Sequence, residues 1–386
     1  MKAENLTVLS LFDGMSCMRI TLDKMGITPG KYYASEIDQH ANKEVATNWP
    51  DTIQLGDVTK WREWDIDWLK VDLLVGGSPC QGFSFAGKQA GTKANLNGVD
   101  FIIETREQYL QAKADGATFY SQSHLFWEYV LCLDYAKEQN PNIKFMLENV
   151  KMKKCFMDMI TCALGVEPVF INSALVSAQN RQRFYWCNWE VAQPEDRGIT
   201  WGDIREHGVN EYYYTEKALQ WLAIHSQRKN KTLDIWSDEE KAQMVEANHY
   251  KNYSSQRFFG ICDLPSDQSV VAAMRGRYIV DGVRQDSKQK TSGLTKQFIE
   301  FRFDGKTNSL TTVSKDNVVV PFTLPERIPA EMFFFRYITV VECCRLQGVP
   351  DDYFKVSSNT QAYKMLGNGW QCDTIEHIFN CLFKSA

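Results

Sequence analysis

Short apolar runs alternate with segments of helical periodicity along the first half of the chain, and this alternation restricts the possible folds more than any other feature. We expect strands at residues 6–12, 32–35, 52–55, 71–75 and 144–147, and helices at residues 15–25, 40–48 and 125–137. Strands that alternate with helices pair in parallel, because each helix carries the chain back before the next strand begins. The sequence therefore predicts an α/β fold with a doubly wound, mostly parallel sheet.

The character of the sequence changes near residue 188. Before that point, residues 169–176 and 183–186 are expected to form the closing strands of the sheet. From residue 188 to about 350, aromatic, turn-forming and charged residues interleave without a period, whereas residues 361–383 are again periodic and predict a helix. A chain of 386 residues exceeds the usual size of one core. We therefore expect a large domain of residues 1–187 plus 351–386, and a smaller, irregular domain of residues 188–350.

Composition argues against several classes of protein. No apolar stretch is long enough to span a bilayer, and the first apolar run is too short for a signal peptide, so we expect an intracellular protein. The 11 cysteines are scattered without the repeated CxxC spacing of a zinc site, which predicts reduced thiols and no bound metal. The net charge of −5 argues against a uniformly basic nucleic-acid binder, although local basic patches can still contact phosphates.

Three strand ends near the N-terminus carry groups that suit a nucleoside. The first strand turns into a helix through Phe12-Asp13-Gly14, where glycine lets the backbone approach a ligand closely. Glu36 ends the second strand, where an acid accepts hydrogen bonds from ribose hydroxyls, and Asp57 ends the third, where it suits an adenine amino group. Alone, either acid could equally be a helix cap or a solvated loop charge. The loop has only one glycine of a G-x-G-x-x-G motif, which disfavours a pyrophosphate ligand and a nicotinamide oxidoreductase.

Cys80 follows a buried strand in the run Gly76-Gly77-Ser78-Pro79-Cys80-Gln81. A free cysteine is most often a small buried hydrophobic residue, but a thiol in a loop at a strand's carboxyl end lies on the edge where such sheets bind ligands. Glu148 ends another strand at that edge. Arg181 and Arg183 are two residues apart, so on a strand they point to the same face and suit a phosphate or a carbonyl oxygen.

Together these motifs resemble those of the cytosine-5 DNA methyltransferases. Gly-Ser-Pro-Cys-Gln, Glu-Asn-Val, Gln-x-Arg-x-Arg, residues 336–348 and Gly367-Asn368-Gly369 occur in the order found in that family. The resemblance covers nearly the whole chain except about 188–335, where the family has its variable target-recognition region. The Phe-Asp-Gly and Ser-Pro-Cys runs are most similar to the animal de novo enzymes. Two departures are Ser16-Cys17, where Gly-Gly is usual, and Gly369-Trp370, where a small polar and an aliphatic residue are usual. Extra sequence also lies between residues 98 and 121.

The resemblance implies transfer of a methyl group from S-adenosylmethionine to carbon 5 of a cytosine flipped out of double-stranded DNA. It implies that Cys80 adds to carbon 6 as the nucleophile and that Glu148 holds ring nitrogen 3 and the amino group. Arg183, with Arg181 beside it, is expected to contact the cytosine carbonyl and the Cys80 loop. The base that removes the carbon 5 proton is not assigned. The cofactor residues implied are Phe12, Asp13, Gly14, Glu36, Ile37, Asp57, Val58, Pro79, Leu125 and Asn368.

Two other functions remain open from the sequence. One is methylation of cytosine in transfer RNA, although this chain lacks the Cys-Phe-Thr run usual in that group. The other is a catalytically inactive DNA-binding relative, although such a protein is expected to have lost the nucleophile or the cofactor acids, which are present here. We expect a monomer in the cytoplasm of a bacterial or phage-infected cell, within or outside a restriction-modification system.

Two segments are candidates for contact with DNA. A glycine-containing loop at residues 81–97 is expected to close over the flipped base. Residues 275–306 carry eight basic and four acidic side chains, which fits either a phosphate-contacting face or an ordinary solvated surface. The DNA recognition sequence is not predicted.

Overall fold

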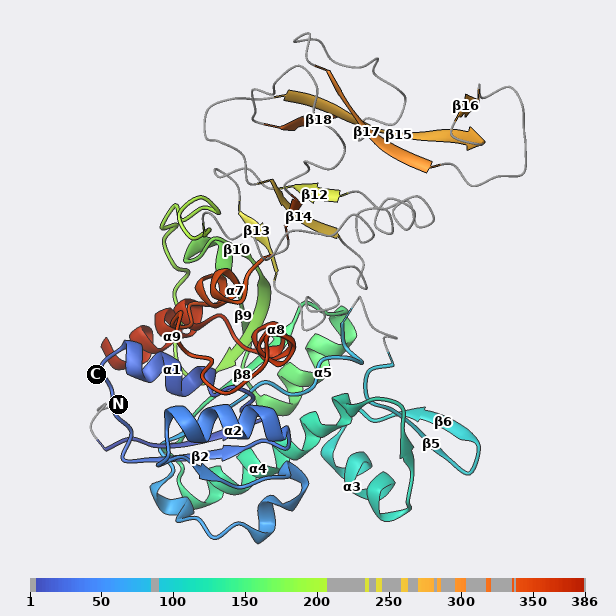
Figure 1. The fold of residues 1–386 in the computed structure, drawn as a ribbon. Coiled ribbons are helices and arrows are strands. Elements are labelled where there is room, and N and C mark those ends of the chain that lie inside the picture. The colour runs from blue at the N-terminus through green and yellow to red at the C-terminus, as the bar shows by residue number, and fades with distance from the viewer. Residues whose placement is uncertain are drawn as a thin grey trace. The chain divides into compact units, whose positions relative to one another are not determined.

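The computed structural model describes residues 5–84, 90–206, 233–235, 241–244, 258–262, 270–280, 283–285, 296–302, 317–320, 335–336 and 338–384. The chain divides into two compact units: residues 1–204, 241–247 and 343–386 form the first, and residues 205–240 and 248–342 form the second. The helices and strands of the first unit are labelled in Figure 1 and are β1 (Thr7–Leu11), α1 (Cys17–Lys24), β2 (Lys31–Ser35), α2 (Gln39–Asn48), β3 (Ile53–Gln54), β4 (Leu73–Gly76), β5 (Lys93–Leu96), β6 (Val99–Ile102), α3 (Arg106–Ala114), β7 (Thr118–Phe119), α4 (Phe126–Gln139), β8 (Lys144–Val150), α5 (Lys154–Leu164), β9 (Pro168–Asn172), β10 (Gln179–Asn180), β11 (Gln182–Cys187), β13 (Ala242–Gln243), α8 (Asn359–Asn368) and α9 (Cys372–Lys384). Helix α7 (Val340–Gln347) spans a boundary between the units. The short 3-10 helices include η1 (Val58–Glu63), η3 (Gln122–Leu125) and η4 (Ser173–Leu175).

Seven of the described strands form the main sheet, in the order β3-β2-β1-β4-β8-β11-β9. Strand β1 pairs in parallel with β2 and β4, and β4 pairs in parallel with β8. Strand β11 runs antiparallel to both of its neighbours, β8 and β9. The predicted α/β class, with a doubly wound and mostly parallel sheet, is confirmed.

Helices cover both faces of this sheet. On one face, Leu9, Leu74 and Phe145 pack in a single apolar core with buried residues of α4 and α5. The alternate side chains of the strands point to the other face and are buried as well, and there the guanidinium of Arg19 in α1 lies over the ring of Tyr32. Burial on both faces explains why these strands are continuous apolar runs rather than alternating ones.

The C-terminal segment differs from the expectation of one helix at residues 361–383. Helix α8 ends at Asn368 and α9 begins at Cys372, with Gly369 in extended backbone at φ −68° and ψ 166°. The side-chain oxygen of Gln371 accepts a hydrogen bond from the N–H of Thr374 at 2.7 Å, which satisfies one unpaired donor of the first turn of α9. Apolar periodicity continues across this break, so the pattern alone predicted a single helix.

The extra sequence noted between residues 98 and 121 belongs to a small module on the first unit. Strands β5, β6 and β7 form an antiparallel sheet, and α3 follows β6 in the chain (Figure 1). Glu128 of α4 anchors this module, since its fully buried carboxylate accepts hydrogen bonds from the hydroxyl of Tyr109 at 2.8 Å and the indole of Trp61 at 3.2 Å. Lys113 of α3 completes the anchor with an ion pair at 2.6 Å.

Replacing Lys113 by methionine should destabilise the protein by about 3 kcal/mol, because the buried carboxylate of Glu128 then lacks its positive partner. The matched control is Lys70→Met, which breaks an ion pair with Asp67 of similar length, 2.9 Å, between two exposed side chains. We expect little change there, since water and salt screen an exposed pair. Urea unfolding of both variants measures the difference, and equal effects would contradict the anchoring role of Glu128.

Apart from the start of α7, the regular elements described in the second unit are strands. Strands β12 (Leu233–Ile235), β14 (Phe258–Cys262) and β19 (Phe335–Arg336) form one sheet, and β15 (Val270–Val280), β16 (Val283–Gln285), β17 (Lys296–Arg302) and β18 (Asn317–Val320) form another. The side chains of the basic stretch at residues 275–306 lie outside the described residues. Among the helices that the structure describes, none has both the length and the apolar character needed to cross a membrane.

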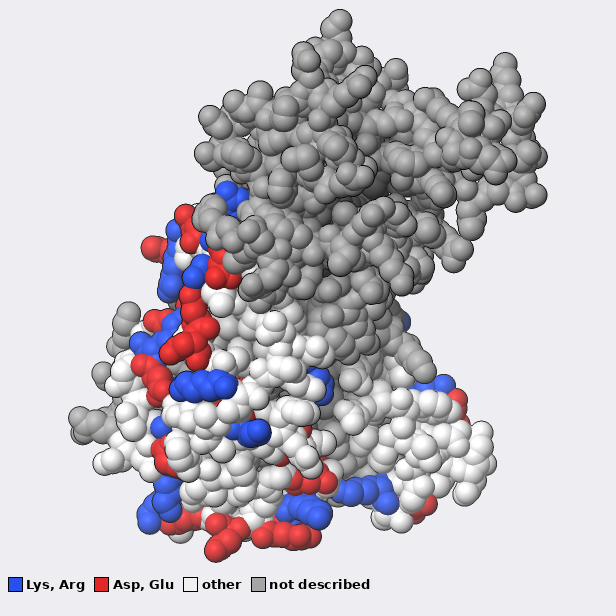
Figure 2. Space-filling view, in the orientation of Figure 1, with Lys and Arg blue, Asp and Glu red and all other residues white. Residues whose placement is uncertain are grey.

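Charged side chains of the first unit gather along the left and lower margins of the face in Figure 2, and much of the rest of that visible surface is uncharged. On the face in Figure 2, lysine and arginine side chains of the described residues are intermixed with aspartate and glutamate rather than gathered in one basic surface.

Candidate active site

The register of the parallel strands places the predicted site residues at one edge of the sheet. Leu11 at the end of β1 pairs with Ser35 of β2 and with Gly76 of β4, and Gly76 pairs with Leu147 of β8. The residues that follow these paired positions are therefore neighbours along that edge. They are Phe12, Glu36, Gly77 and Glu148.

The loop between β1 and α1 is held by hydrogen bonds to Asp13. The carboxyl of Asp13 accepts from the hydroxyl of Tyr32 at 2.7 Å and from the hydroxyl of Ser16, and burial raises the pKa of Asp13 to about 6. Phe12 and Ser16 both have φ of 56°, a conformation that costs a residue with a side chain about 1–2 kcal/mol. Asp13, predicted as a cofactor residue, has one carboxyl oxygen engaged by Ser16 of the loop and the other by Tyr32 of β2, so it supports the loop's shape.

Glu36 joins this loop to the end of β2. One of its carboxylate oxygens accepts from the N–H of Gly14 at 2.8 Å, and the other accepts from the N–H groups of Ile37 and Asp38, each at 2.8 Å. A side chain built at Gly14 would meet no atom within 4 Å, so open space lies beside the loop backbone.

The groups around this open space fit a nucleoside. Ile37 presents an apolar side chain that is 68% exposed, and Glu36 next to it in the chain is half-buried. Asp57, after β3, is an exposed carboxylate. Asp57 also accepts from the N–H of Thr59 at 2.9 Å and so caps η1. An apolar surface suits an adenine ring, and carboxylates suit amino and hydroxyl groups, which is the donor and acceptor pattern of an adenosyl group.

Cys80 lies half-buried in a turn after β4. Its carbonyl accepts from the N–H groups of Phe83 and Ser84, each at 2.9 Å. Before it, Ser78 is held by the carboxamide of Asn149, which donates to the Ser78 hydroxyl oxygen at 3.1 Å and to its carbonyl at 3.3 Å. Burial raises the pKa of the Cys80 thiol, the charge of Glu148 raises it further, and nearby guanidinium groups oppose both effects without cancelling them. The thiol form therefore predominates in the free protein at neutral pH.

Arg183 and Glu148 form the central ion pair of the site. Nε of Arg183 lies 2.9 Å from Oε1 of Glu148, and the two residues are 7% and 8% exposed. The other nitrogens of Arg183 donate to the carbonyl of Gln182 at 2.9 Å and to the sulfur of Met244 at 3.1 Å. Met244 follows β13, which pairs with β10, and no local signal in the sequence indicated this contact.

Arg181 points to a different partner, because it lies between β10 and β11 rather than within one strand. Its Nη2 donates to the carbonyl of Gly369 at 2.7 Å, and burial lowers the pKa of Arg181 to about 10. The charges of both arginines act on the thiol of Cys80, but the two side chains have different hydrogen-bond partners. Arg183 holds Glu148, and Arg181 holds the segment between α8 and α9.

The two departures from the family pattern meet in this segment. The N–H of Trp370 donates to the sulfur of Cys17 at 3.2 Å, and a Cβ at Gly369 would lie only 3.0 Å from that sulfur. Glycine at 369 thus makes room for a cysteine at 17. A Cβ at Gly77 would lie 2.7 Å from Nε1 of Trp370 and 3.3 Å from Oε2 of Glu148, so the indole and the carboxylate both lie against Gly77. The sequence marked Trp370 as unusual but not as a site residue.

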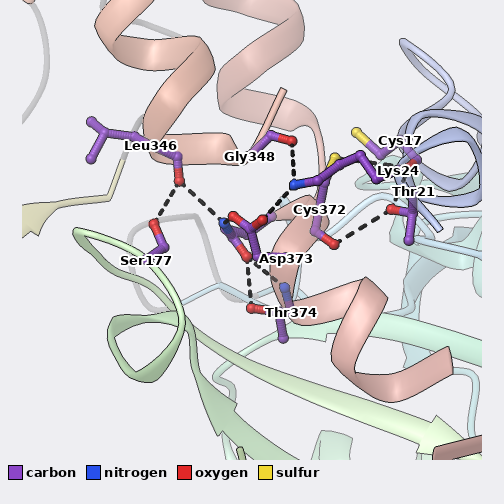
Figure 3. Close-up of polar contacts among 10 residues, drawn as sticks. Cys17, Thr21, Lys24, Ser177, Leu346, Gly348, Cys372, Asp373 and Thr374 are labelled. Carbon is purple, nitrogen blue, oxygen red and sulfur yellow. Dashed lines mark hydrogen bonds and ion pairs between the residues drawn. The ribbon is translucent and has the colours of Figure 1, made fainter. Parts of the chain in front are cut away.

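A network of hydrogen bonds fixes the same segment to the rest of the first unit (Figure 3). The carbonyl of Leu346 accepts from Ser177 at 2.9 Å and from Gln371 at 3.4 Å. It also accepts from Gln179, the first residue of Gln-x-Arg-x-Arg, at 3.1 Å. Lys24 of α1 donates to the carbonyl of Gly348 at 3.0 Å and pairs with Asp373 of α9. These contacts connect α1, α7, α9 and β10, which immediately precedes Arg181.

Comparison with known proteins agrees with the geometry. A family model described as C-5 cytosine-specific DNA methylase matches residues 6–105 and 111–384. The type II methyltransferase M.HpaII of Haemophilus parainfluenzae is 25% identical over 392 residues, which cover 95% of this chain and 86% of that protein. The orphan methyltransferase M.SPBetaI of Bacillus phage SPbeta is 24% identical over 441 residues, covering 97% and 96%. A solved methyltransferase structure from Entamoeba histolytica shares the fold, with a TM-score of 0.59 and 14% identity over 99% of both chains.

Proposed function

Because the chain belongs to the C-5 cytosine-specific DNA methylase family, and is therefore a DNA (cytosine-5)-methyltransferase that uses S-adenosylmethionine, we propose that Cys80 is its nucleophile and Glu148 its acid–base partner. One observation carries the proposal. Cys80 follows β4, Glu148 stands in β8 and Arg183 in β11, and the strand register brings the three together at one edge of the sheet. The charges of Glu148 and Arg183 both act on the thiol of Cys80.

Carbon 5 of cytosine is a weak nucleophile until a group adds at carbon 6. The Cys80 thiol gives up its proton, which Glu148 takes up and shares with ring nitrogen 3. The resulting thiolate forms a bond to carbon 6, and the electrons of the ring double bond shift toward carbon 5. Bound S-adenosylmethionine supplies the methyl group as an electrophile. A base then removes the proton from carbon 5, the electrons of that C–H bond restore the ring double bond, and Cys80 leaves carbon 6 as a thiolate.

Activation of Cys80 depends on the cytosine itself in this scheme. In the free protein, the charge of Glu148 helps to raise the pKa of Cys80. When the cytosine enters, Glu148 takes up a proton in order to donate a hydrogen bond to ring nitrogen 3, which carries no proton of its own. The negative charge of Glu148 is then lost, and Arg183 favours the Cys80 thiolate. The nucleophile is therefore activated when the cytosine has entered the site, which limits side reactions of an exposed thiolate.

The cofactor is proposed to lie along the open space beside the loop between β1 and α1. Glu36 and Asp57 would accept from its hydroxyl and amino groups, and Ile37 would contact the adenine ring. Asp13 would act indirectly by holding the loop. The further residues proposed to line this site are Phe12, Gly14, Val58, Pro79, Leu125 and Asn368.

The DNA contacts are assigned by position in the chain. We assign target recognition to residues 188–350. The segment expected to close over the flipped cytosine, residues 81–97, includes strand β5 at Lys93–Leu96, so we assign closure to its part between Gly82 and Gly91, of which residues 85–89 lie outside the described residues. The protein is proposed to act as a monomer on double-stranded DNA in the cytoplasm of a bacterial or phage-infected cell, the setting of the type II and phage relatives.

Incubation with tritiated S-adenosylmethionine should label duplex DNA and leave transfer RNA unlabelled. Duplex DNA that contains 5-fluorocytosine should form a stable adduct, because fluorine cannot leave carbon 5 as a proton does. Digestion and mass spectrometry should place that adduct on the peptide with Cys80. Label confined to RNA would reject DNA as the substrate, and an adduct on an exposed cysteine such as Cys155 or Cys162 would reject the proposed nucleophile.

A further inference from the structure

Ser123 is a fully buried residue of η3 whose hydroxyl contacts both sides of the Cys80 turn. The hydroxyl donates to the carbonyl of Pro79 at 2.8 Å and accepts from the N–H of Gly82 at 2.9 Å. Pro79 immediately precedes Cys80, and Gly82 follows it by two residues. A single hydroxyl therefore closes the short stretch of chain that carries the nucleophile.

A second layer of contacts fixes the base of this turn. The carbonyl of Gly82 accepts from the N–H of Gly91 at 2.8 Å, and the hydroxyl of Ser121 donates to the carbonyl of Gly91 at 2.9 Å. The N–H of Ser123 donates to the hydroxyl of Ser121 at 3.3 Å. Gly82, Gly91, Ser121 and Ser123 thus form one hydrogen-bonded group, which we call the serine joint.

The serine joint is packed without spare space. A Cβ at Gly82 would lie 2.5 Å from the hydroxyl oxygen of Ser121, 2.6 Å from the carbonyl oxygen of Gly91 and 2.9 Å from the hydroxyl oxygen of Ser123. Gly91 has φ of 56°, and a Cβ there would lie 2.3 Å from the ring of Phe156. Glycine is required at both positions because the hydroxyl groups and the aromatic ring approach the backbone so closely.

The joint is anchored to the core of the first unit. Helix η3 continues directly into α4, where Phe126, Trp127 and Tyr129 are at most 1% exposed. Ser123 therefore has little freedom to move, and its hydroxyl transmits that rigidity to Pro79 and Gly82. Leu125, two residues further along η3, is among the proposed cofactor residues. The same short helix thus contacts the turn of the nucleophile through Ser123 and carries a proposed cofactor residue, Leu125.

We propose that Ser123 is a positioning residue for methyl transfer, which acts through Pro79 and Gly82 to hold Cys80 at attacking distance from carbon 6 of the target cytosine. The inference rests on the proposed role of Cys80. It goes beyond that role because it assigns the placement of the thiol to a residue that contacts neither substrate nor cofactor.

The test compares Ser123→Ala with a matched control, Ser173→Ala. Ser173 is also fully buried and also takes part in a hydrogen bond, accepting from the hydroxyl of Thr374 at 2.9 Å, but it lies in η4. In single-turnover trapping with 5-fluorocytosine DNA, Ser123→Ala should form the adduct about tenfold to a hundredfold more slowly than the wild type. Ser173→Ala should retain the wild-type rate, and both variants should bind S-adenosylmethionine as the wild type does.

Hydrogen exchange gives a readout that does not depend on activity. The amide of Gly82 loses its acceptor in Ser123→Ala and should exchange faster, whereas Ser173→Ala should leave that amide protected. Thermal unfolding of both variants measures the loss of stability that each substitution causes. A trapping rate in Ser123→Ala equal to that of Ser173→Ala would overturn the proposal, and so would unchanged exchange at Gly82.

Ser121→Ala serves if Ser123→Ala does not fold, because it weakens the joint and keeps the hydroxyl of Ser123. It should slow trapping in the same direction by a smaller factor, and an unchanged rate would overturn the proposal. The Cys80→Ser variant separates the two proposals. If Cys80 is not the nucleophile, this variant still forms the adduct. If only the role of Ser123 is wrong, Cys80→Ser forms no adduct.

Discussion

Replacing Cys80 by serine should abolish the covalent adduct with 5-fluorocytosine DNA and lower the rate of methyl transfer by a factor on the order of 10⁴ or more. A serine hydroxyl ionises far less readily than a thiol, so the addition to carbon 6 that activates carbon 5 is lost. Cys80 lies half-buried in a turn, and exchanging sulfur for oxygen changes its volume little. Binding of S-adenosylmethionine and the melting temperature should therefore stay close to those of the wild type.

The control for this variant is Cys155→Ser, at an exposed cysteine of α5. It should retain both adduct formation and methyl transfer. Methyl transfer is measured with labelled S-adenosylmethionine and duplex DNA, and binding by calorimetry. Substantial methyl transfer by Cys80→Ser, with a covalent adduct still present, would remove Cys80 from the mechanism.

Replacing Glu148 by glutamine should move two measurements in opposite directions. Methyl transfer should fall by about 10²- to 10⁴-fold, because an amide cannot share a proton with ring nitrogen 3 as a carboxyl does. The thiol of Cys80 should become more reactive at the same time. Burial and then the charge of Glu148 raise the pKa of Cys80, so removing the charge lowers that pKa. A lower pKa gives a larger thiolate fraction at any pH below it.

Alkylation of Cys80 by iodoacetamide, followed across a series of pH values by mass spectrometry, measures this shift. In Glu148→Gln the alkylation profile should move to lower pH, whereas Glu167→Gln, at an exposed acid outside the site, should leave it in place. A profile that is unchanged in Glu148→Gln, or that moves to higher pH, would contradict the electrostatic coupling between Glu148 and Cys80.

Much of the architecture and the chemical groups of the site was predictable from local sequence. The apolar runs indicated the strands of the main sheet, because burial on both faces leaves a continuous apolar pattern. Cys80 and Glu148 could be placed at one edge, because consecutive parallel strands end on the same side. The prediction of one C-terminal helix was wrong, because the apolar periodicity continues across the break at Gly369 between α8 and α9.

The sequence by itself therefore determined the fold class and the residues proposed to carry the chemistry. The spacing of apolar residues and the residue types found in turns are both set by residues that are close together in the chain. The tertiary structure decided what those residues contact. Arg181 donates to Gly369, 188 residues away, and Trp370 donates to Cys17, 353 residues away. Ser123 braces the turn of Cys80 from more than 40 residues further along the chain. Such contacts depend on the packing of whole strands and helices against one another, and no local pattern records that packing.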